Sequence, residues 1–169
     1  MENIDLDKNL ALESLYCEYN QLKKLDASKN KNLVTLYCFC NKIKEINVSD
    51  LNKLVDLQCQ GNEIKKLNIS KNEKIQYLNC GENKIKKLNV SKNKNLISLA
   101  CYTNKIKKLS FTKNKKLISL NCYYNKLKTI NLTKNKNLKD LSLRNTTIKN
   151  IHITKCKNLE LLNLNYTSI

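Results

Sequence analysis

The sequence predicts a repeat solenoid of about eight coils, in which residues 1–169 form one domain with a parallel β-sheet along one face. Leucine recurs every 21 residues through the whole chain, with no insertion or deletion. When Leu15 is counted as position 1 of each unit, cysteine recurs at position 3 and asparagine at position 6 in six successive units. Each unit is therefore expected to form one coil that stacks on the next. The position 1 residues are Leu15, Leu36, Leu57, Leu78, Leu99, Leu120, Leu141 and Leu162.

Within each unit, the segment from position 21 to position 5 predicts one short strand. Side chains alternate along a strand, so positions 1 and 3 are expected to point inward and positions 21, 2 and 4 outward. Strands that repeat in register pair in parallel at about 4.8 Å. The aliphatic residues at positions 8, 11, 13 and 19 are expected to fill the space behind the sheet, where each contributes roughly 1.5 to 3 kcal/mol.

Asparagines mark the two connections of each predicted coil. The position 6 residues, such as Asn104, are expected to close the turn after the strand and to bond backbone groups of adjacent coils. The Ser/Thr-Lys-Asn-Lys-Asn segments, such as 91–95, are expected to be solvated turns that return the chain to the next strand.

The repeat has a recognisable consensus. Residues 96–106 read L-x-x-L-x-C-x-x-N-x-I, which resembles the leucine-rich repeat with cysteine in place of the second strand leucine. The 21-residue length and the column of unpaired cysteines are similar to the cysteine-ladder members of the internalin family, which are bacterial surface proteins that bind host ligands. The resemblance implies an α/β-type, right-handed leucine-rich repeat superhelix. Its parallel sheet would form the concave face, and short extended or 3-10 segments would form the convex side.

The resemblance also implies a role in adhesion and virulence at the bacterial cell surface or outside the cell. Met1 and Ile169 both fall at position 8, so the ends lie inside repeat units. We expect the chain to be a fragment of a longer array, or else an array closed by degenerate repeats. If the chain is complete, a cytoplasmic location is expected instead. Open strand edges at both ends favour end-to-end self-association.

Eight cysteines raise the question of disulfides or metal binding, and their spacing argues against both. Ladder cysteines in register stay near 4.8 Å apart, farther than the roughly 3.8 Å between Cβ atoms that a disulfide prefers. No C-x-x-C motif occurs, and Cys38-Phe39-Cys40 has no nearby histidine in sequence. No metal or cofactor is predicted. Cys40 and Cys156 lie outside the ladder and are expected to be the most accessible thiols.

No catalytic constellation is apparent, and the sequence predicts a protein that is not an enzyme. His152 is the only histidine and is expected to be solvated on the convex side. Asp56 and Asp140 share position 21 but lie four coils apart, about 19 Å by the strand spacing. Phosphate-loop, dinucleotide-binding and metalloprotease motifs are also missing. The chain has no run of 18 apolar residues and its first residues, MENIDLDKNL, are polar, so membrane insertion is not expected.

Charge and aromatic residues separate onto different columns. The formal net charge is +18, with 31 lysines and one arginine. Positions 21 to 5 of all eight units contain no lysine and all eight tyrosines. Exposed tyrosine supplies rigid contact area at interfaces, so these columns predict a ligand-binding face. The predicted ligand-binding residues are Tyr16, Tyr37, Phe39, Tyr77, Tyr102, Tyr123, Tyr124 and Arg144.

Two functions from different classes fit these columns. The first is a non-catalytic protein-binding module that presents the aromatic face to a partner, such as a host surface protein, as the resemblance implies. The same face also leaves glycan binding open. The second is an electrostatic binder of nucleic acid or another anionic polymer through the lysine columns. Nucleic acid is disfavoured because arginine is almost absent and the tyrosines face away from the lysines.

Overall fold

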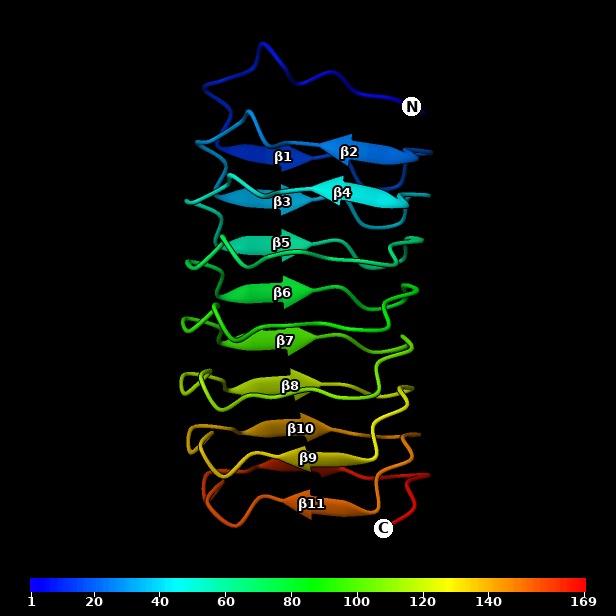
Figure 1. The fold of residues 1–169 in the computed structure, drawn as a ribbon, viewed down its shortest axis with the longest axis vertical. Helices are drawn as coiled ribbons and strands as arrows, with labels where there is room; N and C mark the ends of the chain where they lie inside the picture. Colours follow the sequence, from blue (N-terminus) through cyan, green and yellow to red (C-terminus); the bar gives the residue numbers. More distant parts are fainter.

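The computed structural model describes residues 1–169 as a right-handed solenoid whose coils stack along the long axis of the molecule (Figure 1). Eight short strands form a parallel sheet with the order β1-β3-β5-β6-β7-β8-β10-β12. Every pairing joins residues 21 apart, as in Leu15 with Leu36, which confirms the predicted parallel register. The strands are β1 (Ser14–Tyr16), β3 (Thr35–Tyr37), β5 (Asp56–Gln58), β6 (Tyr77–Asn79), β7 (Ser98–Ala100), β8 (Ser119–Asn121), β10 (Asp140–Ser142) and β12 (Leu161–Asn163).

On the opposite side of each coil, here called the back face, the backbone is extended. Strands β2 (Lys24–Asp26) and β4 (Glu45–Asn47) pair near the N-terminal end, and β9 (Thr129–Asn131) and β11 (Asn150–His152) pair near the C-terminal end. No helix forms, so the 3-10 alternative and the helical part of the α/β-type expectation are not realised. A helix is about 10 Å wide, and coils stacked evenly at about 4.8 Å leave no room for one on each coil.

One hydrophobic core of 40 residues fills the space between the sheet and the back face. The middle residue of nearly every main-sheet strand is buried while its neighbours are more exposed, as the alternation predicts. Leucine or isoleucine at position 8 is almost fully buried from Leu22 to Ile148. Phe111 takes position 13 in its coil and is fully buried. The core is therefore a stack of identical layers, each contributed by one coil.

Each strand ends in a residue with a left-handed backbone. All eight residues at position 5 have positive φ, from 48° at Thr103 to 65° at Gly61. Glycine and asparagine adopt this conformation readily, whereas larger residues do so at a cost of roughly 1 to 2 kcal/mol. The column nevertheless contains Tyr19, Tyr124 and Tyr166. Something in every coil must therefore stabilise this turn, and the next residue does so.

The asparagine at position 6 closes the turn and joins two coils. In Asn104, Nδ2 donates to the carbonyls of Cys101 and Tyr102 in its own coil and to Cys80 in the preceding coil. Its Oδ1 accepts a hydrogen bond from the backbone N–H of Ile85 at 2.9 Å. Asn41, Asn62, Asn83 and Asn125 repeat this pattern of bonds. The predicted role of this column is confirmed.

A second buried asparagine column was not expected from the sequence. Asn93, the middle of the segment 91–95, is fully buried, which corrects the prediction that these segments are solvated. Its Nδ2 donates to the carbonyls of Ile69 and Asn72 in the preceding coil. Each of these carbonyls also accepts a backbone N–H of its own turn, so the amide side chain adds the bond that joins the two coils. Asn30, Asn72, Asn114 and Asn135 make the same pair of bonds.

The cysteine ladder is buried and unpaired, as predicted. All eight cysteines are free, and only Cys40 is exposed. The Sγ atoms of Cys101 and Cys122 approach to 3.4 Å as a thiol contact. Burial, followed by the charge of Glu18, raises the pKa of the Cys17 thiol to about 11. The prediction that Cys156 is accessible is wrong, because it takes the position of the second asparagine column and its thiol donates to the carbonyl of Leu132.

We expect Asn104→Ala to lower the free energy of unfolding by about 2 to 3 kcal/mol, because it leaves the buried Ile85 amide without a partner and removes one of the two amide bonds to the Cys80 carbonyl. Urea unfolding followed by circular dichroism measures the change. Asn137→Ala is the matched control: this side chain is exposed and makes one bond, to the carbonyl of Lys115. Equal effects of the two substitutions would contradict the role assigned to position 6.

We also expect iodoacetamide at pH 8 to alkylate one of the eight thiols rapidly in the native protein, because the thiolate is the reactive form and only Cys40 is exposed. Mass spectrometry of the intact protein counts the adducts. Cys40→Ser should abolish the rapid reaction, and unfolding in urea should expose all the remaining thiols. Rapid native labelling at two or more positions would show that the ladder is open to solvent.

Candidate recognition surface

The main sheet presents one broad outer surface, here called the sheet face, formed by the side chains at positions 21, 2, 4 and 5. All eight predicted ligand-binding residues lie on it, on the strands or just after them. No lysine lies there, and its charged residues are Glu18, Asp56, Glu82, Asp140 and Arg144. The coil spacing brings aromatic side chains of adjacent coils into contact. They gather into two clusters.

The first cluster joins coils one and two. The rings of Tyr16 and Tyr37 meet edge to face with centroids 5.2 Å apart, and those of Tyr19 and Phe39 do the same at 5.2 Å. Tyr37 and Phe39 are 6.4 Å apart and link the two pairs. Edge-to-face pairs at these distances are favourable. Tyr16 and Tyr19 are well exposed, so the cluster offers aromatic area to a partner.

A carboxylate holds one ring of this cluster in place. The phenol O–H of Tyr37 donates to Oδ2 of Asp56 at 2.8 Å, and Gln58 donates its amide N–H to the other oxygen, Oδ1. This hydrogen bond to the carboxylate, followed by partial burial, raises the pKa of Tyr37 to about 12. Asp56 therefore serves to orient an aromatic side chain on this face. Asp140 occupies the same column on β10, beyond reach of Asp56, as expected.

The second cluster spans coils five to eight. Tyr102 and Tyr123 stack with centroids 4.7 Å apart and planes 16° from parallel, and Tyr124 meets Tyr123 edge to face at 5.6 Å. The Arg144 guanidinium lies 5.9 Å from the Tyr124 ring and 5.5 Å from the Tyr166 ring. A guanidinium between two rings makes cation–π contacts and is held in a defined place.

A glycine makes room for the stacked pair. A Cβ added at Gly81 would come within 2.5 to 2.7 Å of the Tyr102 ring, so no other residue fits there while the ring keeps its place. Partial burial raises the pKa of the Tyr102 and Tyr123 phenols, because it disfavours the charged phenolate. The contact of Gly81 with a ring one coil further on depends on the stacking.

Not every predicted site residue joins a cluster. Tyr77 on β6 is exposed but makes no aromatic pair. Tyr19 and Tyr166 were not selected from the sequence, yet each belongs to a cluster. Both share position 5 with Tyr124, so the shared column was the signal that could have identified them.

Two acceptor atoms on the sheet face are covered but lack a hydrogen-bond partner. They are Oε2 of Glu18 and Oε1 of Gln60, both at position 4. A buried acceptor without a partner costs roughly 1 to 3 kcal/mol.

Outside the sheet face, the features that could matter for function are potential metal ligands, the single histidine, any membrane-spanning helix and the C-terminal edge. No group of three His, Cys, Asp or Glu side chains is placed to hold a metal ion. His152 is exposed on β11, on the back face as expected. The structure has no helix of the length and apolarity needed to cross a bilayer. At the C-terminal end, Leu161 and Leu162 of the edge strand β12 are exposed, and end-to-end association stays a prediction.

We expect Asp56→Ala to return the pKa of one tyrosine from about 12 toward its ordinary value near 10, which titration of absorbance at 295 nm measures. The Asp56–Tyr37 bond contributes fully to stability below the ordinary tyrosine pKa, and this contribution is lost as the pH rises through 12. Asp140→Ala removes the same side chain from the same column and should leave the tyrosine titration unchanged. An unchanged titration in Asp56→Ala would contradict the hydrogen bond.

Comparison with known proteins supports the interpretation of the 21-residue unit as a leucine-rich repeat. A family model described as leucine-rich repeats in two copies matches residues 11–53. No curated protein sequence matches the chain. Among solved structures, the functional domain of InlJ from Listeria monocytogenes, which includes a cysteine ladder, is 26% identical with a TM-score of 0.67. The match covers 98% of this chain and 46% of that one.

Two further structures share the fold. A leucine-rich repeat protein of Leptospira interrogans is 25% identical with a TM-score of 0.92, covering 99% of this chain and 47% of that one. The internalin InlF of Listeria monocytogenes is 23% identical with a TM-score of 0.83, covering 92% and 48%. The chain thus spans about half the length of these proteins. The family match, the 21-residue coil and the buried cysteine ladder show that the chain has a leucine-rich repeat fold similar to that of the bacterial internalins.

Proposed function

We propose that the chain is a non-catalytic protein-recognition module that binds a folded partner on its sheet face. The observation that carries the proposal is the pair of aromatic clusters on a surface free of lysine. Tyrosine and arginine are, with tryptophan, the residues enriched among interface hot spots, and the two clusters consist of tyrosines, Arg144 and Phe39.

The clusters combine order with exposure. The Asp56 bond, the Gly81 contact and the Arg144 contacts fix some of the rings. Rings held in this way lose little conformational entropy when a partner binds. Tyr16, Tyr19, Tyr124 and Tyr166 leave between 45% and 76% of their surface open to contact.

The distance between the clusters suits a protein rather than a small molecule. Three coil spacings separate the clusters, from coil two to coil five, about 14 Å at the strand spacing. The polar side chains of Gln58, Gln60 and Asn79 lie between them, so a partner that contacts both clusters must span a broad, open surface. Resemblance to the internalins supports a setting at the bacterial surface, with a host protein as the partner class.

The test is capture of partners from mammalian cell-surface extract and bacterial lysate in high salt, followed by calorimetry with the purified partner. One variant removes exposed rings of the first cluster, Tyr16→Ser with Tyr19→Asn. Another removes those of the second, Tyr124→Asn with Tyr166→Asn. Asparagine is chosen at position 5 because it tolerates positive φ. We expect each variant to weaken binding by about 2 kcal/mol or more.

The matched control is Leu10→Ser with Ile118→Ser, which removes exposed apolar side chains outside the sheet face and should leave binding unchanged. Circular dichroism confirms that each variant is folded. A partner bound equally by both cluster variants and the parent would refute the proposal. Loss of binding after enzymatic removal of the partner's sugars would instead assign the face to glycan recognition.

A further inference from the structure

The net positive charge of the chain is concentrated in its middle. Residues 1–82 contain 12 lysines and 12 acidic residues, so their charges cancel. Residues 83–139, here called the basic segment, contain 16 lysines and no aspartate or glutamate, which accounts for +16 of the net +18. A general preference for lysine would not remove every acid from 57 successive residues while leaving 12 in the 82 before them.

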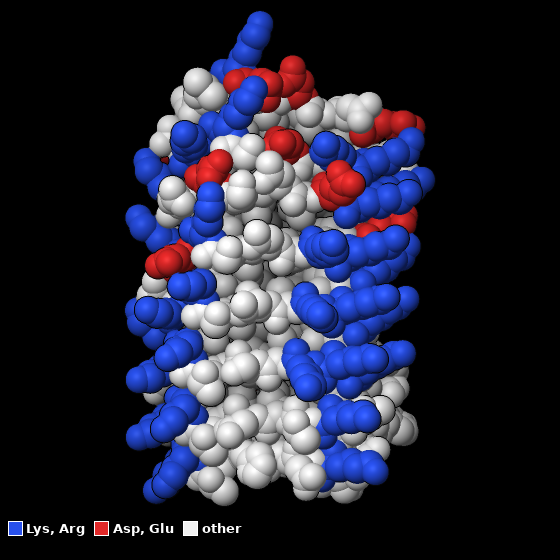
Figure 2. Space-filling model, viewed as in Figure 1, with Lys and Arg blue, Asp and Glu red and all other residues white.

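The structure places these lysines on two ridges of the back face. Lys86, Lys87, Lys105, Lys107, Lys108 and Lys126 line one hollow, and they form the first ridge. Lys94, Lys113, Lys115, Lys116 and Lys134 line another and form the second ridge. Figure 2 shows the back face, with rows of basic side chains on either side of a central stripe that carries little charge.

The lysines of both ridges lack ion-pair partners. Five of the six ion pairs in the molecule involve an acid in residues 1–82, and the sixth joins Lys139 to Glu160. None involves a lysine of either ridge. Like charges gathered in this way repel one another and raise the local positive potential, which attracts anions.

In the stripe between the ridges, part of the backbone makes no hydrogen bonds to neighbouring coils. Toward the two ends of the back face, β2 pairs with β4 and β9 pairs with β11. Between them, no backbone hydrogen bond joins residues 86–89 or 107–110 to another coil. Their N–H and C=O groups are therefore free to bond a ligand or water.

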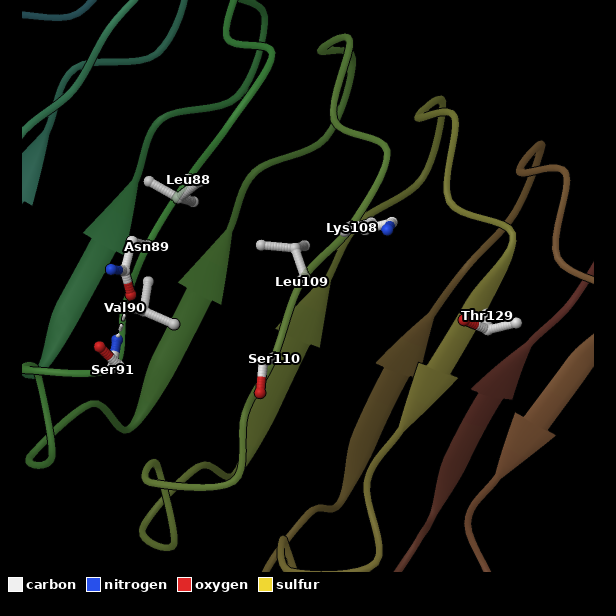
Figure 3. A pocket seen from close by; sticks show the side chains of 8 residues that line it. All are labelled: Leu88, Asn89, Val90, Ser91, Lys108, Leu109, Ser110 and Thr129. Carbon is white, nitrogen blue, oxygen red and sulfur yellow. Dashed lines mark hydrogen bonds between the residues drawn. The ribbon is translucent and has the colours of Figure 1, made fainter.

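A hollow of about 530 Å³ lies at this opening (Figure 3). Asn89, Ser91, Ser110 and Thr129 line it together with Lys108 of the first ridge. Its floor also includes Leu88, Val90 and Leu109. The hydroxyls of Ser110 and Thr129 make no hydrogen bond within the chain, so both are available.

We propose that this region of the back face binds a hydroxyl-bearing linear polyanion, namely a sulfated or phosphorylated polysaccharide. The ridges attract its anionic groups, and the floor hydrogen-bonds its hydroxyls. Nucleic acid fits less well because the only arginine and all eight tyrosines lie on the opposite face, so bases find nothing to stack on. This site is separate from the proposed protein-binding face.

The test uses the full chain and labelled dextran sulfate, measured by fluorescence anisotropy over a series of salt concentrations. The ridge variant carries Lys86→Gln, Lys107→Gln, Lys108→Gln and Lys126→Gln. The control variant carries Lys42→Gln, Lys44→Gln, Lys65→Gln and Lys66→Gln, which removes the same charge from the same columns in coils two and three. There Glu45 and Glu63 lie among the lysines.

We expect the ridge variant to bind dextran sulfate roughly tenfold or more weakly and with a reduced dependence on salt, because fewer counterions are released. The control variant should change affinity by less than about threefold, since its lysines lie beside acids. Equal losses in the two variants would overturn the proposal by showing attraction to net charge alone.

A second variant tests the floor. Ser110→Ala with Thr129→Val should weaken dextran sulfate binding several-fold and leave binding of polyphosphate, which has no hydroxyls, unchanged. An equal effect on both polymers, or none on either, would refute hydroxyl recognition. Tighter binding of single-stranded DNA than of dextran sulfate at matched salt would assign the ridges to nucleic acid. The variants of the sheet face should bind dextran sulfate as the parent does, which keeps the two proposals distinguishable.

Discussion

The structure depends on one repeated hydrogen-bonding unit, the position 6 amide side chain. Asn104 bonds two carbonyls of its own coil, one carbonyl of the preceding coil and one backbone N–H of that coil. It thereby stabilises a left-handed turn that its neighbour Thr103 would otherwise disfavour, and it sets the register between coils. An inserted residue would put the two bonds to the preceding coil out of register, which explains why the 21-residue length does not vary.

Fixed register turns every repeat position into a straight row along the molecule. Rows pointing inward form the layered core, and the narrow space behind position 3 suits a thiol, so the cysteines form a buried ladder. Rows pointing outward place equivalent side chains about 4.8 Å apart, close to the preferred separation of aromatic rings. The stacked Tyr102–Tyr123 pair and the edge-to-face Tyr16–Tyr37 pair both follow from this spacing.

The same geometry allows the sheet face and the back face to carry different kinds of side chain. Lysines on the back face contribute little to stability, since the ion pairs they form are exposed and such pairs are worth at most about 1 kcal/mol each. The amide bonds and the hydrophobic core hold the coils together instead. Surface columns are therefore free to vary, and the protein carries aromatic clusters on one face and an acid-free lysine field on the other without compromising the fold.

The sequence by itself determined the solenoid, the strand positions, the core columns and the surface that carries the aromatic residues, because a fixed period assigns every side chain to a row. Tertiary structure decided which rows and residues meet across coils. Only stacking shows that Gly81 accommodates the Tyr102 ring, that Asp56 holds Tyr37, and that Arg144 lies between two tyrosines. Burial of Asn93 and Cys156 likewise depends on carbonyls of the preceding coil, which no single repeat contains. The unpaired backbone at residues 86–89 and 107–110 also could not be predicted from the sequence. Backbone pairing on the back face depends on how neighbouring coils lie against each other, and the repeat sequence does not show it.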